Sequence, residues 1–257
     1  DLISKFCVAD ELRGAQHKGM PVRAPGDLAA PVLAIDGPSG TGKGTIAARV
    51  AEYLGWHTLD SGALYRAIAF LAVENRIDPG DTDGLEELAK SSVVEFVVRS
   101  DGVNILLDDR DITDEVRSES GGKNASIYAK IPAVRKALLH RQQAMRTAPG
   151  LVADGRDMGT VVFPDAFLKV FLEASATVRA QRRHKQLSGK GFDVKLRALE
   201  REIAERDEQD RNRAASPLVP AADAIVLDTS EKDIGQVFAD VMQLVDKRLS
   251  SRQISRT

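Results

Sequence analysis

A glycine-rich loop constrains the fold of this 257-residue chain more than any other feature of the sequence. The loop GPSGTGKGT, residues 37–45, follows the apolar run PVLAID (31–36) and precedes Ile46, Val50 and Leu54 at helical spacing. Glycines in such a loop let successive backbone N–H groups turn inward at a helix N-terminus, where they stabilise an anion. The combination of strand, loop and helix therefore predicts a phosphate-binding P-loop rather than a glycine turn that only connects two elements.

The loop departs from the usual G-x-x-x-x-G-K-[ST] pattern at one position. Gly44 stands where a Mg²⁺-binding serine or threonine normally follows the lysine, and Thr45 offers its hydroxyl one residue later. Lys43 supplies a positive charge for the β and γ phosphates of a nucleotide. The loop resembles that of nucleoside-monophosphate kinases, and the absence of a later N-K-x-D guanine signature argues against a GTPase. The predicted ATP-binding residues of the loop are Gly37, Pro38, Ser39, Gly40, Thr41, Gly42, Lys43, Gly44 and Thr45.

The rest of the chain alternates short apolar runs with segments of helical period. This alternation predicts an α/β fold with a three-layer core, in which helices flank a parallel sheet. The expected strands cover residues 31–36, 56–60, 151–157, 166–174 and 223–228. The expected helices cover residues 43–54, 61–74, 133–147, 175–187, 194–208 and 234–249.

The middle of the chain interrupts this rhythm. VVEFVVRS-DG-VNILLDDRDIT (93–113) predicts an antiparallel hairpin or a three-strand meander that turns at Asp101 and Gly102. We interpret this region, about residues 76–131, as an insertion with its own small sheet inside a domain that covers 31–250.

Composition and the chain ends exclude several classes of function. The formal net charge of -2 provides no overall basic field for nucleic acid, and the single cysteine, Cys7, excludes disulfides and cysteine-based metal sites. No apolar run approaches the roughly 20 residues of a membrane helix, and no signal pattern is present, so we expect a cytoplasmic protein without a membrane partner. Residues 1–30 are expected to be a flexible leader, with a short docked helix as the alternative, and 251–257 a frayed tail.

Arginines recur after the predicted strands and on the late helices. They suit phosphoryl transfer between two anionic nucleotides because the guanidinium binds phosphate oxygens in pairs and keeps its charge. The candidates are Arg66, Arg135, Arg156, Arg182, Arg183, Arg206, Arg211 and Arg213. A solvated surface charge is the alternative for each, and it is favoured for Arg179, Arg197 and Arg201, whose neighbours include glutamates at pairing distance. Arg156 stands out because it follows an apolar strand, where open α/β sheets bind ligands.

Two carboxylates flank Arg156 in the stretch ADGRDMGT. Asp154 has a Walker-B-like position, suited to holding Mg²⁺ through water. Asp157 has the chemistry to accept a hydrogen bond from the amino group of a base, as carboxylates do with cytosine N4. Capping of a turn or helix is the alternative for either residue, and the sequence leaves the division of these roles open.

From Pro31 to about Leu249 the chain resembles the bacterial cytidylate kinase family of P-loop kinases. The shared landmarks are IDGPSGTGKGT, LDSGALYR, NAS followed after five residues by PAVR, ADGRDMGTVVFPDA and ERDEQDRNRAASPLVPAADA. The resemblance implies a parallel-sheet core, a monophosphate-binding insertion and a short lid over about 180–212. It implies a monomeric transferase of pyrimidine nucleotide metabolism, which uses Mg²⁺ and moves the γ-phosphoryl group of ATP to CMP or dCMP.

The resemblance also implies roles for individual residues. The acceptor phosphate is expected among Ser61, Arg66, Arg156 and Arg213. The cytosine is expected against Ser126, Arg135 and Asp157, and the sugar near Arg206 and Asp210. The ATP side of the lid is expected to carry Arg182 and Arg183. The expected catalytic residues are Lys43, Arg156, Arg182 and Arg213, and the expected Mg²⁺ contacts are Thr45, directly or through water, and Asp154, through water.

One segment departs from the family pattern, and two other functions stay open. Gly121, Gly122 and Lys123 precede Ser126, and paired glycines are expected to loosen the approach to it. The first alternative function is a P-loop kinase for UMP, AMP or a small metabolite, although Asp157 and Ser126 argue against purines. The second is a regulatory module that hydrolyses ATP slowly without phosphorylating a partner, which the many arginines argue against. A panel of acceptors distinguishes all three.

Overall fold

The computed structural model describes residues 30–254, except for 100–101, 190, 192–193 and 214–215. Nearly all of the predicted leader and the predicted turn residue Asp101 therefore lie outside the described residues. The last helix, α9 (Ile234–Ile254), continues into the segment expected to be a frayed tail. Within the described ranges, no helix combines the length and the apolar character that crossing a bilayer requires.

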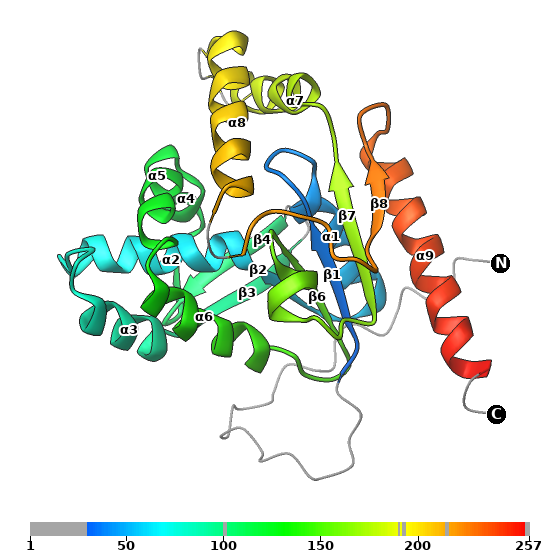
Figure 1. Ribbon diagram of the computed structural model, residues 1–257, viewed down its shortest axis with the longest axis horizontal. Coiled ribbons are helices and arrows are strands. Elements are labelled where there is room, and N and C mark those ends of the chain that lie inside the picture. Colours follow the sequence, from blue (N-terminus) through cyan, green and yellow to red (C-terminus); the bar gives the residue numbers. More distant parts are fainter. Residues whose placement is uncertain (1–29, 100–101, 190, 192–193, 214–215, 255–257) are drawn as a thin grey trace.

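The centre of the molecule is a parallel sheet of five strands (Figure 1). Its strands are β1 (Val32–Asp36), β2 (His57–Asp60), β6 (Leu151–Gly155), β7 (Leu168–Glu173) and β8 (Ile225–Asp228), and they lie in the order β2-β6-β1-β7-β8. Every neighbouring pair is parallel, so each connection crosses over the sheet, and most crossovers contain helices. The predicted α/β class and the position of each predicted strand are confirmed.

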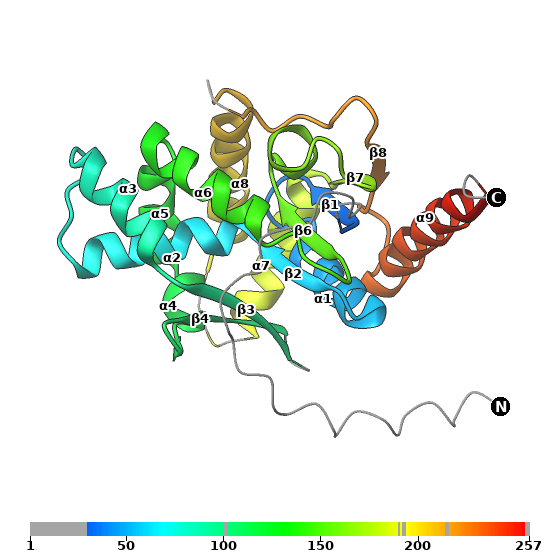
Figure 2. The ribbon, with the colours of Figure 1, turned by 90° about the horizontal axis from the view of Figure 1, so that it is seen from below.

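Helices cover both faces of the sheet because its central strand is apolar on both sides. Leu33 and Ile35 pack with α1 (Lys43–Leu54) and α9, whereas Val32 and Ala34 pack with α2 (Ser61–Glu74) and α6 (Pro132–Ala144). Figure 2 shows α1 and α9 together, with α2 and α6 across the sheet from them. This alternation along one strand produces the three layers expected from the sequence.

The region between α2 and α6 contains the predicted antiparallel sheet and three helices that the sequence pattern did not predict. The sheet consists of β3 (Val94–Arg99), β4 (Gly102–Leu107) and β5 (Arg110–Asp111), which confirms the meander. The additional helices are α3 (Thr82–Ser91), α4 (Thr113–Arg117) and α5 (Glu119–Tyr128). Side-chain caps begin two of them, since Asp81 accepts from Gly84 N in α3 and Ser118 accepts from Gly121 N in α5.

The pair Gly121-Gly122 occupies a tight contact between α4 and α5 instead of loosening the chain. A Cβ atom added at Gly121 would lie 2.6 Å from Glu115 O and 2.8 Å from Val116 O. At Gly122 the nearest atom to an added Cβ would be Arg66 Nη2, at an ordinary 3.7 Å. The first glycine therefore allows the backbones of α4 and α5 to approach closely.

We expect Gly121→Ala to lower the free energy of unfolding by about 1–3 kcal/mol, because the added methyl group must push two backbone carbonyls away. The matched Gly122→Ala variant should be neutral or slightly stabilising, because alanine favours the helix and meets no close atom. Urea unfolding of both variants measures the difference. Equal unfolding midpoints for the two would contradict the close approach of α4 and α5.

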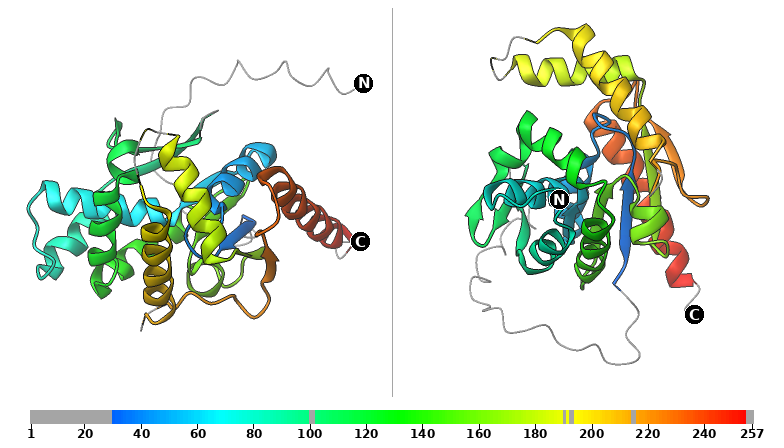
Figure 3. Two further views of the ribbon diagram at one scale, coloured as in Figure 1. Left: turned by 90° about the horizontal axis from the view of Figure 1, so that it is seen from above. Right: turned by 60° about the vertical axis from the view of Figure 1, so that its left-hand side comes forward.

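Two helices extend beyond the carboxyl end of the sheet (Figures 1 and 3). They are α7 (Ala176–Ser188) and α8 (Leu196–Arg211), and they pack on each other around the buried side chains of Ala180, Leu199 and Ile203. A single π-helical turn, η1 (Met158–Val162), follows β6 at the same end of the sheet. The helices α7 and α8 and the turn η1 thus all lie toward the carboxyl end of the sheet.

Candidate active site

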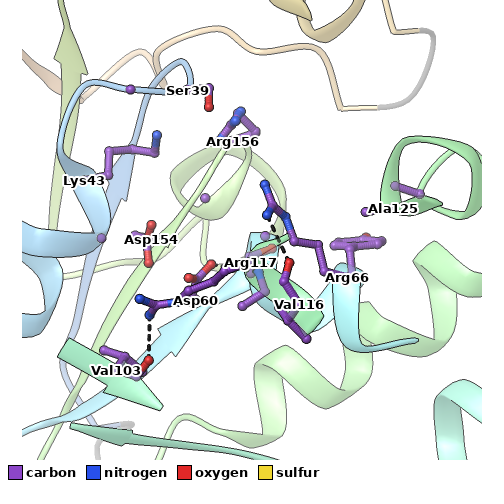
Figure 4. A pocket seen from close by; sticks show the side chains of 18 of the residues that line it. Ser39, Lys43, Asp60, Arg66, Val103, Val116, Arg117, Ala125, Asp154 and Arg156 are labelled. Carbon is purple, nitrogen blue, oxygen red and sulfur yellow. Dashed lines mark hydrogen bonds between the residues drawn. The ribbon is translucent and has the colours of Figure 1, made fainter. Parts of the chain in front are cut away.

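A cleft of about 740 Å³ opens beyond the carboxyl ends of β2 and β6 and beside the phosphate loop. Figure 4 shows Lys43 and Arg156 reaching into its upper part, with Asp154 and Asp60 lower in the cleft. The cleft is lined by these predicted site residues: Ser39, Gly40, Gly42, Lys43, Gly44, Thr45, Ser61, Arg66, Ser126, Arg135, Asp154, Arg156, Asp157, Arg206, Asp210 and Arg213. Segments that are far apart in the sequence thus meet in one place.

The phosphate loop wraps around the start of α1. Gly40 and Gly42 adopt positive φ values of 83° and 90°, which glycine tolerates without a steric cost. Lys43 Nζ donates to Pro38 O at 2.8 Å, so the ammonium group folds back over the loop. Burial lowers the pKa of Lys43, and the charge of Arg156 lowers it further, whereas Asp154 opposes the shift. An anion bound in the loop would therefore favour the charged form of this lysine.

Carboxylates lie under the loop, at the ends of adjacent strands. Burial raises the pKa of Asp154 well above its usual range, the charge of Asp60 raises it further, and Lys43 opposes both. A Cβ atom at Gly44 would lie 3.9 Å from Asp154 Oδ2, so the usual serine or threonine position of the loop faces this carboxylate. In the described ranges, no three His, Cys, Asp or Glu side chains converge on one point as metal ligands. The donors present are a few carboxylate oxygens. Such a set suits Mg²⁺, because this ion keeps several of its waters and takes further ligands from phosphate oxygens.

A cluster of four arginines also lines the cleft, and one of them, Arg156, is hydrogen-bonded to the carboxylate of Asp210. Burial lowers the pKa of Arg66 to about 10, with Arg206 as the next cause, and burial and Arg156 lower the pKa of Arg206. Asp210 accepts from Arg156 Nε at 2.9 Å and lies 3.9 Å from Arg213 Nε. The Nε and Nη2 atoms of Arg213 are buried and make no hydrogen bond with any residue that the structure describes. Buried donors and excess positive charge are the features of an anion site.

A planar donor and an acceptor lie side by side next to the arginine cluster. Arg135 Nη2 donates to Asp157 Oδ2 at 2.7 Å and to Ser216 Oγ at 2.7 Å, and its guanidinium lies 5.7 Å from the ring centroid of Tyr65. Ser126 Oγ donates to Gly122 O at 3.1 Å and lines the same cleft. Because α5, α6 and the end of β6 hold these groups, they form a rigid polar surface suited to the edge of a base.

Arg182 and Arg183, predicted on the ATP side of a lid, do not line the cleft. Arg182 Nη1 donates to Thr229 Oγ1 at 3.2 Å, and its Nη2 donates to Lys232 O at 3.2 Å. Arg183 Nη1 donates to Gln186 Oε1 at 3.1 Å, within the same helix. Their contact with ATP stays a prediction.

The interpretation of Arg179 as a solvated surface charge is wrong. Its side chain is buried, and it donates to Ser39 O in the phosphate loop and to both carboxylate oxygens of Asp207. The sequence does contain a signal for this pair, because Asp207 continues the apolar stripe of Leu199 and Ile203 at spacings of four residues. A charge in an apolar stripe requires a buried partner.

Asp36 is a second site residue that the motifs did not indicate. At the end of β1, its carboxylate accepts from Met158 N at 2.9 Å and from Gly159 N at 2.7 Å. These bonds fix the turn directly after Arg156 and Asp157 to the strand that precedes the phosphate loop. The pKa of Asp36 is raised to about 6, mainly by burial and to a smaller extent by the charge of Asp157, while the hydrogen bonds from Gly159 N and Met158 N oppose the shift.

The raised pKa of Asp36 makes its contribution to stability depend on pH. Its carboxyl binds a proton more tightly in the folded state, where its pKa is about 6, than in the unfolded state, where the pKa has the usual value of 3.8. The resulting stabilisation is complete below 3.8 and is lost as pH rises through about 6. Asp154 shifts in the same direction. We expect wild type to lose more stability between about pH 5 and 7 than Asp36→Asn does, by about 1 kcal/mol, as measured by urea unfolding. An identical pH dependence in both proteins would contradict the assignment.

Known proteins resemble this chain over nearly all of the described domain. The family model described as "Cytidylate kinase" matches residues 33–247. Cytidylate kinase from Pseudomonas paraeruginosa (strain DSM 24068 / PA7) is 56% identical over 218 residues, covering 84% of this chain and 95% of the relative. Cytidylate kinase from Pectobacterium carotovorum subsp. carotovorum (strain PC1) is 54% identical, covering 82% of this chain and 93% of the relative. Cytidylate kinase from Aeromonas salmonicida (strain A449) is 50% identical, covering 88% and 98%.

Proposed function

The chain belongs to the cytidylate kinase family, and we propose that it transfers the γ-phosphoryl group of ATP to CMP and dCMP, forming CDP and dCDP. The family resemblance drawn from the motifs is thereby confirmed. The observation that carries the proposal is one cleft lined both by a phosphate loop and by a cluster of partly buried arginines, of which Arg213 has buried donors with no hydrogen bond to the described residues. Two anionic nucleotides fit such a cleft end to end.

The donor side is the loop from Gly37 to Thr45. Its backbone N–H groups and the α1 N-terminus hold the ATP phosphates, and Lys43 places its charge against the β and γ groups. We assign Mg²⁺ to Thr45, directly or through water, and to Asp154, through water, because Gly44 leaves the space above that carboxylate open. When bound, the metal ion neutralises phosphate charge that the protein alone leaves uncompensated.

The acceptor side is the arginine cluster of Arg66, Arg156 and Arg213, together with Ser61 at the start of α2. The acceptor phosphate is ionised near neutral pH, so an oxygen of it attacks the γ phosphorus without a strong general base. The bond between the γ phosphorus and the bridging oxygen breaks, and ADP leaves with that oxygen. The arginines hold both phosphates in line and balance the charge between them.

Base recognition follows from the polar surface beside the arginines. Asp157 accepts a hydrogen bond from the cytosine amino group, while Arg135 and Ser126 bind the remaining polar edge. Adenine also carries an amino group next to a ring-nitrogen acceptor, so in this proposal a purine is rejected by the size of its fused rings. Arg206 and Asp210 lie on α8 near the sugar.

Closure completes the site in this proposal. The insertion, about residues 76–131, covers the acceptor, and the lid region, about 180–212, brings Arg182 and Arg183 toward ATP. Closure excludes water, which otherwise would take the γ-phosphoryl group. The protein works as a monomer in the cytoplasm.

A coupled assay of ADP release with ATP and Mg²⁺ tests the proposed function. We expect a rate with CMP and dCMP, a weaker rate with UMP, and none above background with AMP and GMP. The UMP rate is weaker because the Asp157 carboxylate favours an amino donor, which UMP lacks, and the purines fail because their fused rings exceed the single ring that this surface accepts. A slow rate that is the same with every acceptor would instead indicate the regulatory module, and a preference for AMP would indicate a different kinase.

A further inference from the structure

Arg179 and Asp207 form a buried ion pair between the phosphate loop and α8. We propose that this pair is a positioning device, which sets the acceptor side chains of α8 relative to the donor loop. The inference rests on the proposed function, because it concerns the alignment of two nucleotides. Neither residue lines the cleft, so neither is expected to touch substrate.

Arg179 uses its whole guanidinium to join three segments. Nε donates to Ala174 O at 2.9 Å, at the end of β7, and Nη1 donates to Ser39 O at 3.0 Å. Nη1 also donates to Asp207 Oδ1 at 2.9 Å, and Nη2 donates to Asp207 Oδ2. A Cβ atom at Gly40 would lie 3.1 Å from the Cβ of Arg179, so the side chain also packs against the loop itself. The planar fork therefore fixes direction as well as distance.

Asp207 transmits this constraint to the cleft through the geometry of α8. Leu199, Ile203 and Asp207 lie four residues apart on the stripe that faces α7. Arg206 and Asp210 lie on the adjacent stripe and line the cleft. Because a helix is rigid over one turn, the rotation that satisfies Asp207 also decides where these two side chains point.

A continuous route of contacts thus connects the two halves of the reaction. It runs from Ser39 O to Arg179, to Asp207, along one turn of α8 to Asp210, and then to Arg156. The exposed fractions of Arg179 and Asp207 are 2% and 6%, so water does not screen the pair. Well-packed apolar residues usually stabilise a fold as well as a buried ion pair does, so stability alone does not account for this one. The bidentate geometry fixes the orientation of Asp207 relative to the loop, and alignment of the two nucleotides requires such a fixed orientation.

The paired variant Arg179→Met with Asp207→Leu tests the proposal. It removes both charges together, so that no unpaired charge remains buried. The control is Arg146→Met with Asp165→Leu, a more exposed pair with a 2.7 Å contact whose residues do not line the cleft. The measurements are the thermal midpoint, the ATP dissociation constant, kcat and KM with CMP, and ATP hydrolysis without acceptor.

We expect the paired variant to fold and to bind ATP within about threefold of wild type, while its kcat with CMP falls about 30-fold. Its KM for CMP should rise, and hydrolysis should increase relative to transfer, because the acceptor is misaligned while the donor loop still binds. The control should change none of these ratios. A folded variant with transfer within threefold of wild type would show that the pair is only structural.

Arg179→Lys provides a second test that keeps the charge and removes the fork. A lysine reaches Asp207 but does not hold Ser39 O and both carboxylate oxygens at once, so kcat should fall at least tenfold. Unchanged kcat in this variant would overturn the proposal even if the paired variant does not fold. If wild type itself shows no CMP-dependent rate, the proposed function fails, which is a separate result.

Discussion

Replacing Lys43 with methionine is expected to lower the rate of phosphoryl transfer about 10³-fold while the protein stays folded. The ammonium group is buried in the phosphate loop, 2.8 Å from Pro38 O, and Lys43 lines the cleft, where we propose that it meets the transferred group. Methionine keeps most of the side-chain volume and removes the charge. Because burial lowers the pKa of Lys43, a charged ammonium group at this position costs folding free energy in the ligand-free protein. The methionine variant has no such cost, so we expect it to stay folded.

Single-turnover transfer to CMP, measured beside the thermal midpoint, checks this expectation. Lys136→Met is the matched control, because Lys136 is exposed on α6 and does not line the cleft. The control should transfer at the wild-type rate. A Lys43→Met protein that retains transfer within tenfold of wild type would contradict the role of this charge.

Gly37→Ala is expected to lower the free energy of unfolding by about 3 kcal/mol or more, and to abolish transfer with it. Gly37 has a φ of +145°, a conformation that residues with a side chain rarely adopt. An added Cβ would lie 2.1 Å from Leu172 O, a backbone atom of the neighbouring strand β7. The methyl group therefore separates β1 from β7 at the point where the phosphate loop begins.

Gly44→Ala is the matched substitution for this stability measurement. Its added Cβ would meet only Asp154 Oδ2, at 3.9 Å, and its φ is not in the positive range. Urea unfolding of the two variants should give a midpoint near wild type for Gly44→Ala and a much lower one for Gly37→Ala. Similar midpoints would mean that β1 and β7 tolerate a side chain between them.

The sheet and its layers were predictable because buried parallel strands are apolar runs, and the runs here stand between clear helical periods. The helices of the insertion differ among themselves. In α3, Leu85, Leu88 and Ala89 recur at helical spacing after the Asp81 cap, so the sequence does contain a signal for this helix. By contrast, α4 buries only Val116, and so short a helix depends on packing against distant segments, which leaves no periodic pattern in the sequence.

The candidate site also contains two kinds of residue, those that a local motif identifies and those whose contacts lie far away in the sequence. Lys43, Arg156 and Asp157 belong to motifs whose neighbours in sequence are also their neighbours in space, and the structure brings them to one cleft. Asp36 binds N–H groups that follow it by more than 120 residues, and Arg179 reaches a loop 140 residues before it. Their partners depend on the tertiary fold, so the spacing of Asp207 indicates a buried partner without identifying Arg179, and nothing near Asp36 in sequence indicates its contacts.

The small apolar cluster between α7 and α8 has a consequence for how the protein loses function on warming. Among the described residues, the buried apolar side chains of this cluster are Ala180, Leu199 and Ile203, whereas far larger clusters support both faces of the sheet. Amide hydrogens of α7 and α8 should therefore exchange with solvent through a local opening, at a lower free energy than those of β1. That opened form keeps the phosphate loop but lacks Arg206 and Asp210, so heating should abolish CMP affinity before ATP affinity.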